Sequence, residues 1–257
     1  MNRLGGSCFV YNSISQDYCV KESIECLKAL CDEVVVLDAG STDGTAELLK
    51  SLEDSKTKVI CLPHSEWETH SGREKLSYFS NLAKSFLTTE WHYCQQADEI
   101  LHQDCFETVR KLIEMPNAEA FWARRINLWG NSQHQLNVGY DRIPVGIEVL
   151  RLAKTIYNSV DDAQSLAAPG NWEYLEDIRI YHAGFVRNRY KHNEKIRHML
   201  VDVFQMGGND PKVEAMGDVF NPWVHFSKED VIPIKEELPV FLKDWAAERD
   251  RINDITV

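Results

Sequence analysis

The chain has 257 residues, of which 44% are hydrophobic, and a formal net charge of −12. This length and composition are typical of one packed α/β domain. The acidic balance, with an isoelectric point near 5.2, argues against a protein whose whole surface follows a nucleic-acid backbone. A local basic patch remains compatible with it.

The sequence contains no run near the roughly 18 apolar residues that a membrane-spanning helix needs, and its first residues lead into a strand. We therefore expect a cytoplasmic protein without a transmembrane segment. The seven cysteines are odd in number and form no CxxC pair. We interpret them as reduced packing residues.

In the first half of the chain, short apolar runs alternate with helical periodicity, which predicts βαβ units and a mostly parallel sheet flanked by helices. Strands are predicted over 8–11, 34–37, 58–62, 91–95 and 118–126. Helices are predicted over 20–31, 48–52, 76–86 and 106–113.

The second half is less regular. Glycine and proline recur from 127 to 170, which predicts loops and short strands that shape an acceptor pocket. Leu238, Leu242 and Trp245 lie at helical spacing and predict a helix that docks on the core or on a partner subunit. We therefore expect a main domain over 1–215 and a C-terminal helical extension over 216–257, packed on the same domain.

Two acidic turns follow predicted strands. The apolar run from Val34 to Leu37 ends in Asp38 and a turn of small residues, and the strand over 91–95 ends in Gln96-Ala97-Asp98-Glu99. In an open α/β sheet, ligands bind beyond the carboxyl ends of the strands. Asp38 and Asp98 together are suited to hold a ribose and a metal ion. Thr42 or Asp43 is predicted to cap the helix after the first turn.

Further polar residues are expected around these turns. Asn12 follows the first strand and is expected to line the same cleft. The segment 179–199 is basic, and bidentate guanidinium contacts suit a diphosphate. Its candidates are His182, Arg187, Arg189, Lys191, Lys195 and Arg197.

Three motifs resemble those of a family-2 type glycosyltransferase with the GT-A fold. The stretch from Val34 to Thr45 is similar to the family's strand and D-x-G-S-T-D-G-T turn. Gln96-Ala97-Asp98-Glu99 resembles its D-A-D-E form of the DxD motif, and the stretch from His182 to Arg187 resembles an H-x-G-x-x-R element. The resemblance extends from about Ser7 to Met199 and implies an α/β fold of the nucleotide-diphospho-sugar transferase type.

This resemblance implies roles for the site residues. Asp38 would contact the nucleoside beside Asn12, and Arg73 would face the nucleotide. Asp98 would bind the metal ion, either Mn²⁺ or Mg²⁺, with His182 as a further ligand. The donor site would include, with these residues, Gln96, Ala97 and Arg187.

The chain departs from the family at Gln96, which stands where the DxD pattern has its first Asp. One negative charge is therefore missing from the implied metal site. A carboxamide oxygen still binds a divalent ion but adds no net charge. Basic residues such as Arg187 would then take over part of the neutralisation of the diphosphate.

The resemblance implies transfer of a sugar from a nucleotide diphosphate sugar, expected to be a UDP sugar, to a glycan or lipid-linked acceptor with inversion. A carboxylate would deprotonate the acceptor. Asp162 is preferred slightly over Asp161, and Glu176 with Asp177 is the other candidate pair. Two tryptophans, Trp129 and Trp172, are candidates to stack on a sugar ring.

Two alternatives stay open. The basic segment would fit an enzyme that glycosylates modified DNA, although the net charge disfavours nucleic acid as a partner. The Gln96 replacement would fit a catalytically silent module that binds nucleotide sugars or a protein. The sequence leaves the acceptor and the possibility of a homo-oligomer undecided.

Overall fold

The computed structural model describes residues 1–137, 147–205 and 226–253. Its strands are β1 (Leu4–Val10), β2 (Glu33–Asp38), β3 (Thr57–Cys61), β4 (Trp91–Cys94), β5 (Glu99–Leu101), β6 (Ala120–Trp129), β7 (Asn131–Leu136), β8 (Glu148–Lys154), β9 (Ser159–Val160), β10 (Ser165–Leu166), β11 (Gly170–Asn171), β12 (Arg179–Phe185) and β13 (Val231–Pro233). Its α-helices are α1 (Val20–Leu30), α2 (Thr45–Ser51), α3 (His64–Thr69), α4 (Glu74–Lys84), α5 (Phe106–Leu112), α6 (Arg189–His198) and α8 (Lys243–Asn253).

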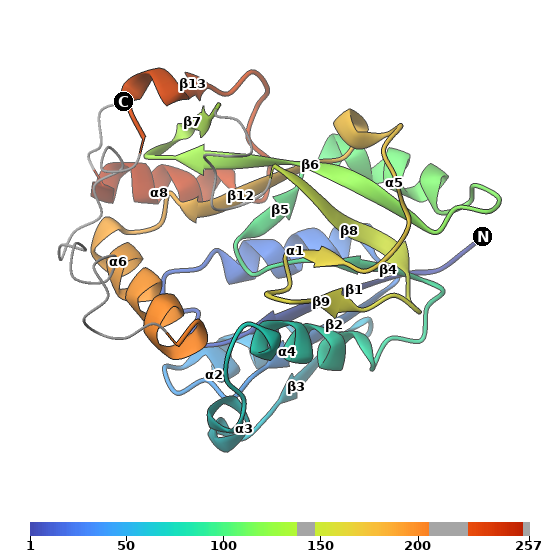
Figure 1. Cartoon of the computed structure of the whole chain (residues 1–257), viewed down its shortest axis with the longest axis horizontal. Coiled ribbons are helices and arrows are strands. Elements are labelled where there is room, and N and C mark those ends of the chain that lie inside the picture. Colours follow the sequence, from blue (N-terminus) through green and yellow to red (C-terminus); the bar gives the residue numbers. More distant parts are fainter. Residues whose placement is uncertain (138–146, 206–225, 254–257) are drawn as a thin grey trace.

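One large sheet crosses the described part of the molecule, and helices flank it (Figure 1). Its main path runs β13-β7-β6-β8-β4-β1-β2-β3, and β12 pairs with both β5 and β6. Within this path, β3, β2, β1 and β4 are all parallel, whereas β8 is antiparallel to both β4 and β6. The expected α/β fold class with a flanked central sheet is confirmed.

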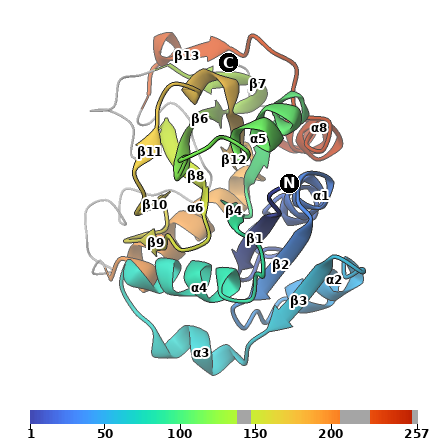
Figure 2. The same ribbon diagram turned by 90° about the vertical axis from the view of Figure 1, so that its right-hand side faces the viewer.

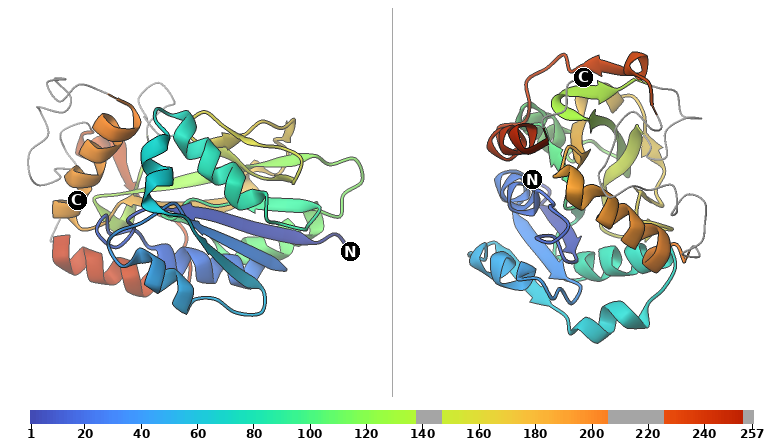
Figure 3. Two further views of the ribbon diagram at one scale, coloured as in Figure 1. Left: turned by 90° about the horizontal axis from the view of Figure 1, so that it is seen from below. Right: turned by 90° about the vertical axis from the view of Figure 1, so that its left-hand side faces the viewer.

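The parallel strand β2 is buried on both faces because different helices cover each face. Val34 and Val36 of β2 pack in the main core with side chains of α1, whereas Leu37 packs in a second cluster with Phe79 of α4. Figures 2 and 3 show α4 on the opposite side of this strand from α1 and α2. This two-sided burial explains the uninterrupted apolar run in the sequence.

The segment expected to be loops and short strands contains a central strand of the sheet. β8 lies between β4 and β6, and all but its two terminal residues are buried. Its Arg151 is fully buried although charged. The glycines and prolines around β8 pointed to loops, and a charged residue within it weakened the strand pattern, so this prediction was wrong for 148–154.

Two other boundaries differ from the prediction. The last helix begins at Lys243 rather than near Leu238, because the carbonyl of Pro239 accepts from the N–H of Leu242 at 2.9 Å and closes a turn that leads into it. Leu238, Leu242 and Trp245 nevertheless all pack in the main core. The proposed boundary between 215 and 216 lies outside the described residues.

The predicted cap of α2 is also different in detail. Gly44, with a φ of 90°, precedes the helix, and its place in the left-handed region suits glycine. Asp43 still accepts a hydrogen bond from the backbone N–H of Thr45, at 3.1 Å. Asp43 therefore stabilises the start of α2 from one residue further away, and Thr42 does not cap it.

All seven cysteines lie in described residues and none is in a disulfide. Six of them are buried, and only Cys61 is exposed. Burial raises the pKa of the Cys31 thiol, and the pKa values of Cys8 and Cys94 shift in the same direction for the same reason. The buried cysteines are therefore inert packing residues.

His92 of β4 makes the stability of the fold depend on pH. It is 1% exposed, and its Nε2 lies 2.8 Å from the hydroxyl of Ser7. Burial, with the nearby charges of Lys84 and Arg151, lowers the pKa of His92 to about 3. An unfolded histidine titrates near pH 6.5, so the unfolded chain binds the extra proton between these two values.

We expect His92 to make its full contribution to the free energy of unfolding above pH 6.5. This contribution should fall by about 1.4 kcal/mol per pH unit as the pH drops towards 3. Urea denaturation at pH 6.5 and pH 5 measures this loss. The side chain of the His92→Gln variant is neutral at both pH values. Between pH 6.5 and pH 5, its free energy of unfolding should therefore fall by about 2 kcal/mol less than that of the wild type. Equal losses in the two proteins would contradict the prediction.

Candidate functional site

The site is built on the carboxyl edge of the parallel strands. Asp38 ends β2 and Asp98 follows β4, and both strands flank β1 in parallel. The two acidic turns predicted from the sequence therefore lie at the same edge of the sheet, on either side of the loop that follows β1. This loop, residues 11–19, connects them.

Asp38 is 1% exposed and shapes its own turn. Its carboxylate accepts hydrogen bonds from the backbone N–H and from the hydroxyl of Ser41. Burial raises the pKa of Asp38, although the bonds from Ser41 oppose this shift. The carboxylate is held in a fixed orientation at the edge of the sheet.

Asn12 joins the loop after β1 to this turn. Its backbone N–H donates to the Ser41 hydroxyl at 2.8 Å, and its Oδ1 accepts from the N–H of Thr42, also at 2.8 Å. The residue has a φ of 47°, in the left-handed region that asparagine tolerates better than most residues. Asp43 ties the same loop down by accepting from the N–H of Ser15 at 2.7 Å.

An aromatic stack that the sequence analysis did not identify covers the first turn. Tyr11 stacks on Trp67 of α3, with ring centroids 3.8 Å apart and an interplanar angle of 7°. The ring of His64, at the start of α3, contacts the carbonyl of Gly40 at 2.9 Å. A Cβ at Gly40 would lie 2.6 Å from the Cα of His64, so this close approach needs glycine. The short helix α3 gave no usable periodicity in the sequence.

Asp98 lies at the centre of a buried charged group and is 5% exposed. Its Oδ2 accepts from Nη2 of Arg187 at 2.8 Å and lies 3.6 Å from Nε2 of His182. Burial would raise the pKa of Asp98, but His182, Arg187 and Lys195 outweigh it, and the net shift is well below the usual range. Asp98 is therefore ionised.

His182 of β12 is oriented by Asn127 of β6. The Nδ1 of His182 lies 3.0 Å from Oδ1 of Asn127, which acts as the acceptor. That bond leaves Nε2 as the ring nitrogen that faces Asp98. A Cβ at Gly184 would lie 2.6 Å from the His182 ring and 3.2 Å from Asp98 Oδ2, so glycine is needed here as well.

Arg187 is 1% exposed, and protein groups use its donors. Besides Asp98, it bonds to the carbonyls of Gly184 at 2.9 Å and Gln16 at 2.6 Å. Its guanidinium also lies over the ring of Tyr18, 4.2 Å from the centroid. Arg187 thereby connects the end of β12 to the loop after β1.

Lys195 of α6 is the other cation of the basic segment that lies near Asp98. Burial, with the nearby charge of Arg187, lowers the pKa of Lys195 to about 8. Its amine lies 5.9 Å from the Tyr18 ring, and no carboxylate of the described residues forms an ion pair with it. Arg189 instead lies at the start of α6, over Tyr190.

The C-terminal helix α8 contacts both the loop after β1 and the start of α6. Arg249 pairs with Asp17 of the loop after β1. Asn253 donates to the carbonyls of Val186 and Arg187, at 2.8 and 3.1 Å, and accepts from the N–H of Arg189 at 2.9 Å. The end of the chain that the structure describes therefore fixes the start of α6.

We expect Asn253→Ala to destabilise the fold, since it leaves the carbonyls of Val186 and Arg187 and the N–H of Arg189 without this partner. Each such group costs about 1 to 3 kcal/mol, so the free energy of unfolding should fall by at least about 2 kcal/mol. Chemical denaturation measures it. Ile252→Ala, at an exposed neighbouring position, is the control and should change stability by less than about 0.5 kcal/mol. A loss in Asn253→Ala no larger than in the control would refute this role.

Glu99, the last residue of the second motif, lies in a buried cluster with two arginines. It contacts Arg125 at 3.1 Å and Arg151 at 2.8 and 2.9 Å, and all three side chains are fully buried. Burial would raise the pKa of Glu99, but the two arginines lower it to about 2. Glu99 therefore binds the strands β6 and β8 to the second acidic turn.

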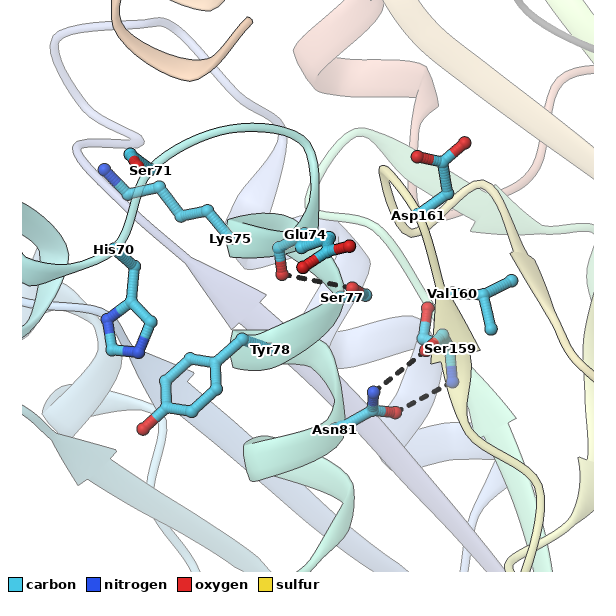
Figure 4. Close-up of a pocket in the computed structure, with 10 residues that line it drawn as sticks. All are labelled: His70, Ser71, Glu74, Lys75, Ser77, Tyr78, Asn81, Ser159, Val160 and Asp161. Carbon is cyan, nitrogen blue, oxygen red and sulfur yellow. Dashed lines mark hydrogen bonds between the residues drawn. The ribbon is translucent and has the colours of Figure 1, made fainter.

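Asp161 and Asp162 lie in the turn between β9 and β10, and this turn reaches the second motif. Nε2 of Gln96 lies 3.4 Å from the carbonyl of Ala163, the residue that follows Asp162. Asp161 is exposed and lines an open cleft of about 580 Å³ beside α4, together with Glu74 and Tyr78 (Figure 4). Asp162 is half-buried.

Other predicted candidates lie apart from this group. Glu176 forms an exposed ion pair with Arg124 at 2.9 Å, in a 3₁₀ turn that also contains Asp177. Trp129 is buried against Phe226 and is a packing residue.

Trp172 and Arg73 are both exposed. Trp172 is 51% exposed and stacks on Trp122, with centroids 4.1 Å apart. Arg73 immediately precedes α4, and its guanidinium lies 5.2 Å from the Phe204 ring. Ala97 is buried in the main core.

Within residues 1–137, 147–205 and 226–253, no cluster of three or more His, Cys, Asp or Glu side chains is placed to bind a metal ion. Asp98 and His182 form a pair rather than such a cluster. In the same residues, no helix has the length and hydropathy to cross a membrane.

Comparison with known proteins gives one family. Residues 10–135 match the family described as glycosyl transferase family 2. The chain is 28% identical over 138 residues to the lipopolysaccharide core biosynthesis glycosyltransferase LpsC of Rhizobium meliloti (strain 1021), which covers 52% of this chain and 47% of that protein. The chain thus spans about half the length of this curated relative.

The solved structures that match the chain are more distant in sequence. S. aureus TarS 1-349 is 13% identical with a TM-score of 0.44, over 77% of this chain and 64% of that one. Mannosyltransferase PcManGT from Pyrobaculum calidifontis, in complex with GDP-Man and Mn²⁺, is 14% identical with a TM-score of 0.43, over 82% and 66%.

The family match runs from the last residue of β1 into β7 and includes both acidic turns. The resemblance to a family-2 type glycosyltransferase, stated from the motifs, is confirmed over these residues. Residues 10–135 of this chain therefore match glycosyl transferase family 2.

Proposed function

We propose that this protein is a glycosyltransferase, which moves a sugar from a nucleoside diphosphate sugar, with UDP as the preferred nucleotide, to a hydroxyl group of a glycan or lipid-linked acceptor. The observation that carries the proposal is the position of Asp38 and Asp98 at one edge of the sheet, on either side of β1. One carboxylate is then available for the nucleoside and the other for the region of the diphosphate.

In this proposal the nucleoside lies over the first turn. Asp38 accepts hydrogen bonds from the ribose or the base, and Asn12 lines the same pocket. The aromatic stack of Tyr11 and Trp67 provides an apolar wall next to them. Arg73 is exposed at the start of α4 and faces the nucleotide.

The diphosphate is assigned to the second turn, Gln96 to Asp98. Lys195 is better suited than Arg187 to neutralise it, since Arg187 already binds three protein groups. Arg187 then acts as a positioning residue that holds Asp98 against the loop after β1. This assignment changes the role that the sequence suggested for Arg187.

A divalent cation, Mn²⁺ or Mg²⁺, is assigned to Asp98 and His182. The donor set fits, because Asn127 leaves Nε2 of His182 free and directs it to within 3.6 Å of the carboxylate. Such ions commonly take one or two protein ligands and complete their shell with phosphate oxygens and water. When bound, the ion would neutralise charge on the leaving diphosphate.

The reaction requires a base, and we assign this role to Asp162. Its carboxylate takes the proton from the acceptor hydroxyl as that oxygen forms a bond to the anomeric carbon. The bond between this carbon and the diphosphate breaks, and the nucleoside diphosphate leaves with the electron pair, so that the configuration inverts. The contact between Gln96 and Ala163 supports Asp162 over Glu176, which forms its ion pair on β6.

The test is release of nucleoside diphosphate from a panel of UDP, GDP and TDP sugars, with Mn²⁺, Mg²⁺ or EDTA, together with calorimetric binding of each nucleotide. We expect binding and slow release with one nucleotide, and loss of both in Asp38→Asn. The matched control Asp104→Asn, at an exposed residue, should behave as the wild type. Binding without any release would favour the silent module, and no binding would overturn the proposal.

A further inference from the structure

The hairpin formed by β9 and β10 is held at its first strand by α4. The side-chain amide of Asn81 makes two hydrogen bonds to the backbone of Ser159, at 2.9 and 2.8 Å (Figure 4). Lys84 donates to the carbonyl of Tyr157 at 2.7 Å. The entry to the hairpin is therefore attached to α4, a helix that packs in the second cluster.

The exit of the hairpin is held by buried arginines from the sheet. Nη1 of Arg151 donates to the carbonyls of Ala163 and Gln164, both at 3.0 Å, and Arg125 donates to Oε1 of Gln164 at 2.9 Å. Both arginines also bind Glu99, one residue after Asp98. The exit of the hairpin is thus coupled directly to the second acidic turn.

Between these anchors the backbone is strained. Asp161 has a φ of 53° and Ala163 a φ of 61°, both in the left-handed region that side chains with a Cβ disfavour. Ala163 is 3% exposed and packs in the cluster that includes Leu37 of β2. Such strain persists only where surrounding contacts impose it, and it is concentrated at functional sites.

Gln96 makes the contact between the hairpin and the second motif itself. Its Nε2 lies 3.4 Å from the carbonyl of Ala163, and its backbone carbonyl accepts from the Ser23 hydroxyl at 3.2 Å. A carboxylate at this position has no hydrogen to donate and would repel the carbonyl oxygen. The amide therefore serves a contact that an aspartate in the DxD pattern could not make.

We propose that Gln96 is a positioning residue and not a metal ligand: with Arg151, it fixes the turn of Asp161 and Asp162 beside Asp98. The proposal rests on the proposed function, since it gives the turn its role on the acceptor side. It also explains why Gln96 stands where the DxD pattern has its first aspartate. The side chain at this position contacts the hairpin through its amide instead of binding a metal ion through a carboxylate. The turn is preorganised before any acceptor binds.

The decisive variant is Gln96→Glu, which keeps the shape of the side chain and replaces the donor by a carboxylate. Gln96 is half-buried at the edge of the site, so the fold should be retained. We expect turnover at saturating donor to fall by at least about tenfold while the KM for the donor changes little, because only the turn is displaced. If Gln96 were a weak metal ligand, the added charge would instead raise Mn²⁺ affinity and turnover.

A second readout does not depend on activity. Amide hydrogen exchange in the segment 157–166 should become several-fold faster in Gln96→Glu and also in Arg151→Lys, which keeps the charge but loses the planar fork. Gln133→Glu, the same change at an exposed position of β7, should leave both turnover and exchange unchanged.

The outcomes separate the two proposals. Unchanged exchange in Gln96→Glu, or a gain in Mn²⁺ affinity, overturns the positioning role whatever the enzyme's donor. If exchange rises as expected but the wild type releases nucleoside diphosphate from no donor, the positioning role is supported and the proposed function fails.

Discussion

Asp98→Asn is expected to reduce sugar transfer by at least about a hundredfold and also to destabilise the fold. The variant loses the charge assigned to the diphosphate site, where each preorganised electrostatic contact is worth a factor of about 10² to 10³ in rate. It also leaves the buried guanidinium of Arg187 without its carboxylate. Removing one member of a buried pair costs about 3 to 5 kcal/mol, and the retained amide oxygen places the expected loss near 3.

Two measurements are needed because the two effects have different causes. Urea denaturation gives the free energy of unfolding, and nucleoside diphosphate release gives the rate for the fraction that is folded. Asp104→Asn is the matched control, because its side chain is 67% exposed and should affect neither quantity. Near-normal turnover in folded Asp98→Asn would remove Asp98 from the site.

Glu99→Gln is expected to destabilise the fold more than Asp98→Asn does, with a loss of about 3 to 5 kcal/mol in the free energy of unfolding. The carboxylate is fully buried and compensates two buried guanidinium groups, those of Arg125 and Arg151. The neutral amide cannot balance either charge, and one of its two polar atoms is a donor that faces other donors. Turnover should fall as well, since both arginines also hold the turn of Asp162.

The control for this variant is Glu176→Gln, on the exposed ion pair with Arg124. Exposed pairs contribute about 0 to 1 kcal/mol, so this variant should remain close to the wild type in chemical denaturation. A similar small loss in Glu99→Gln would show that the buried cluster is not what binds β6 and β8 to the second motif.

The sequence was sufficient where local patterns and tertiary contacts agree. The apolar run before Asp38 and the helical spacing of Val20, Ile24 and Leu27 predicted elements that the structure contains, because these residues are buried on faces that match their periodicity. It failed at β8, where the fully buried Arg151 interrupts an otherwise apolar strand. No local pattern reveals that Glu99, 52 residues away, compensates that charge.

The sequence by itself determined the fold class, the family and the two acidic turns, because these depend on short motifs and on the alternation of strands and helices. Only the tertiary structure decided how the charged residues are used. Arg187 and Glu99 appear in motifs that suggest ligand binding, yet both are buried and paired with protein groups. The physical reason is that a charge inside the protein must be compensated, and its partners come from strands that are distant in sequence.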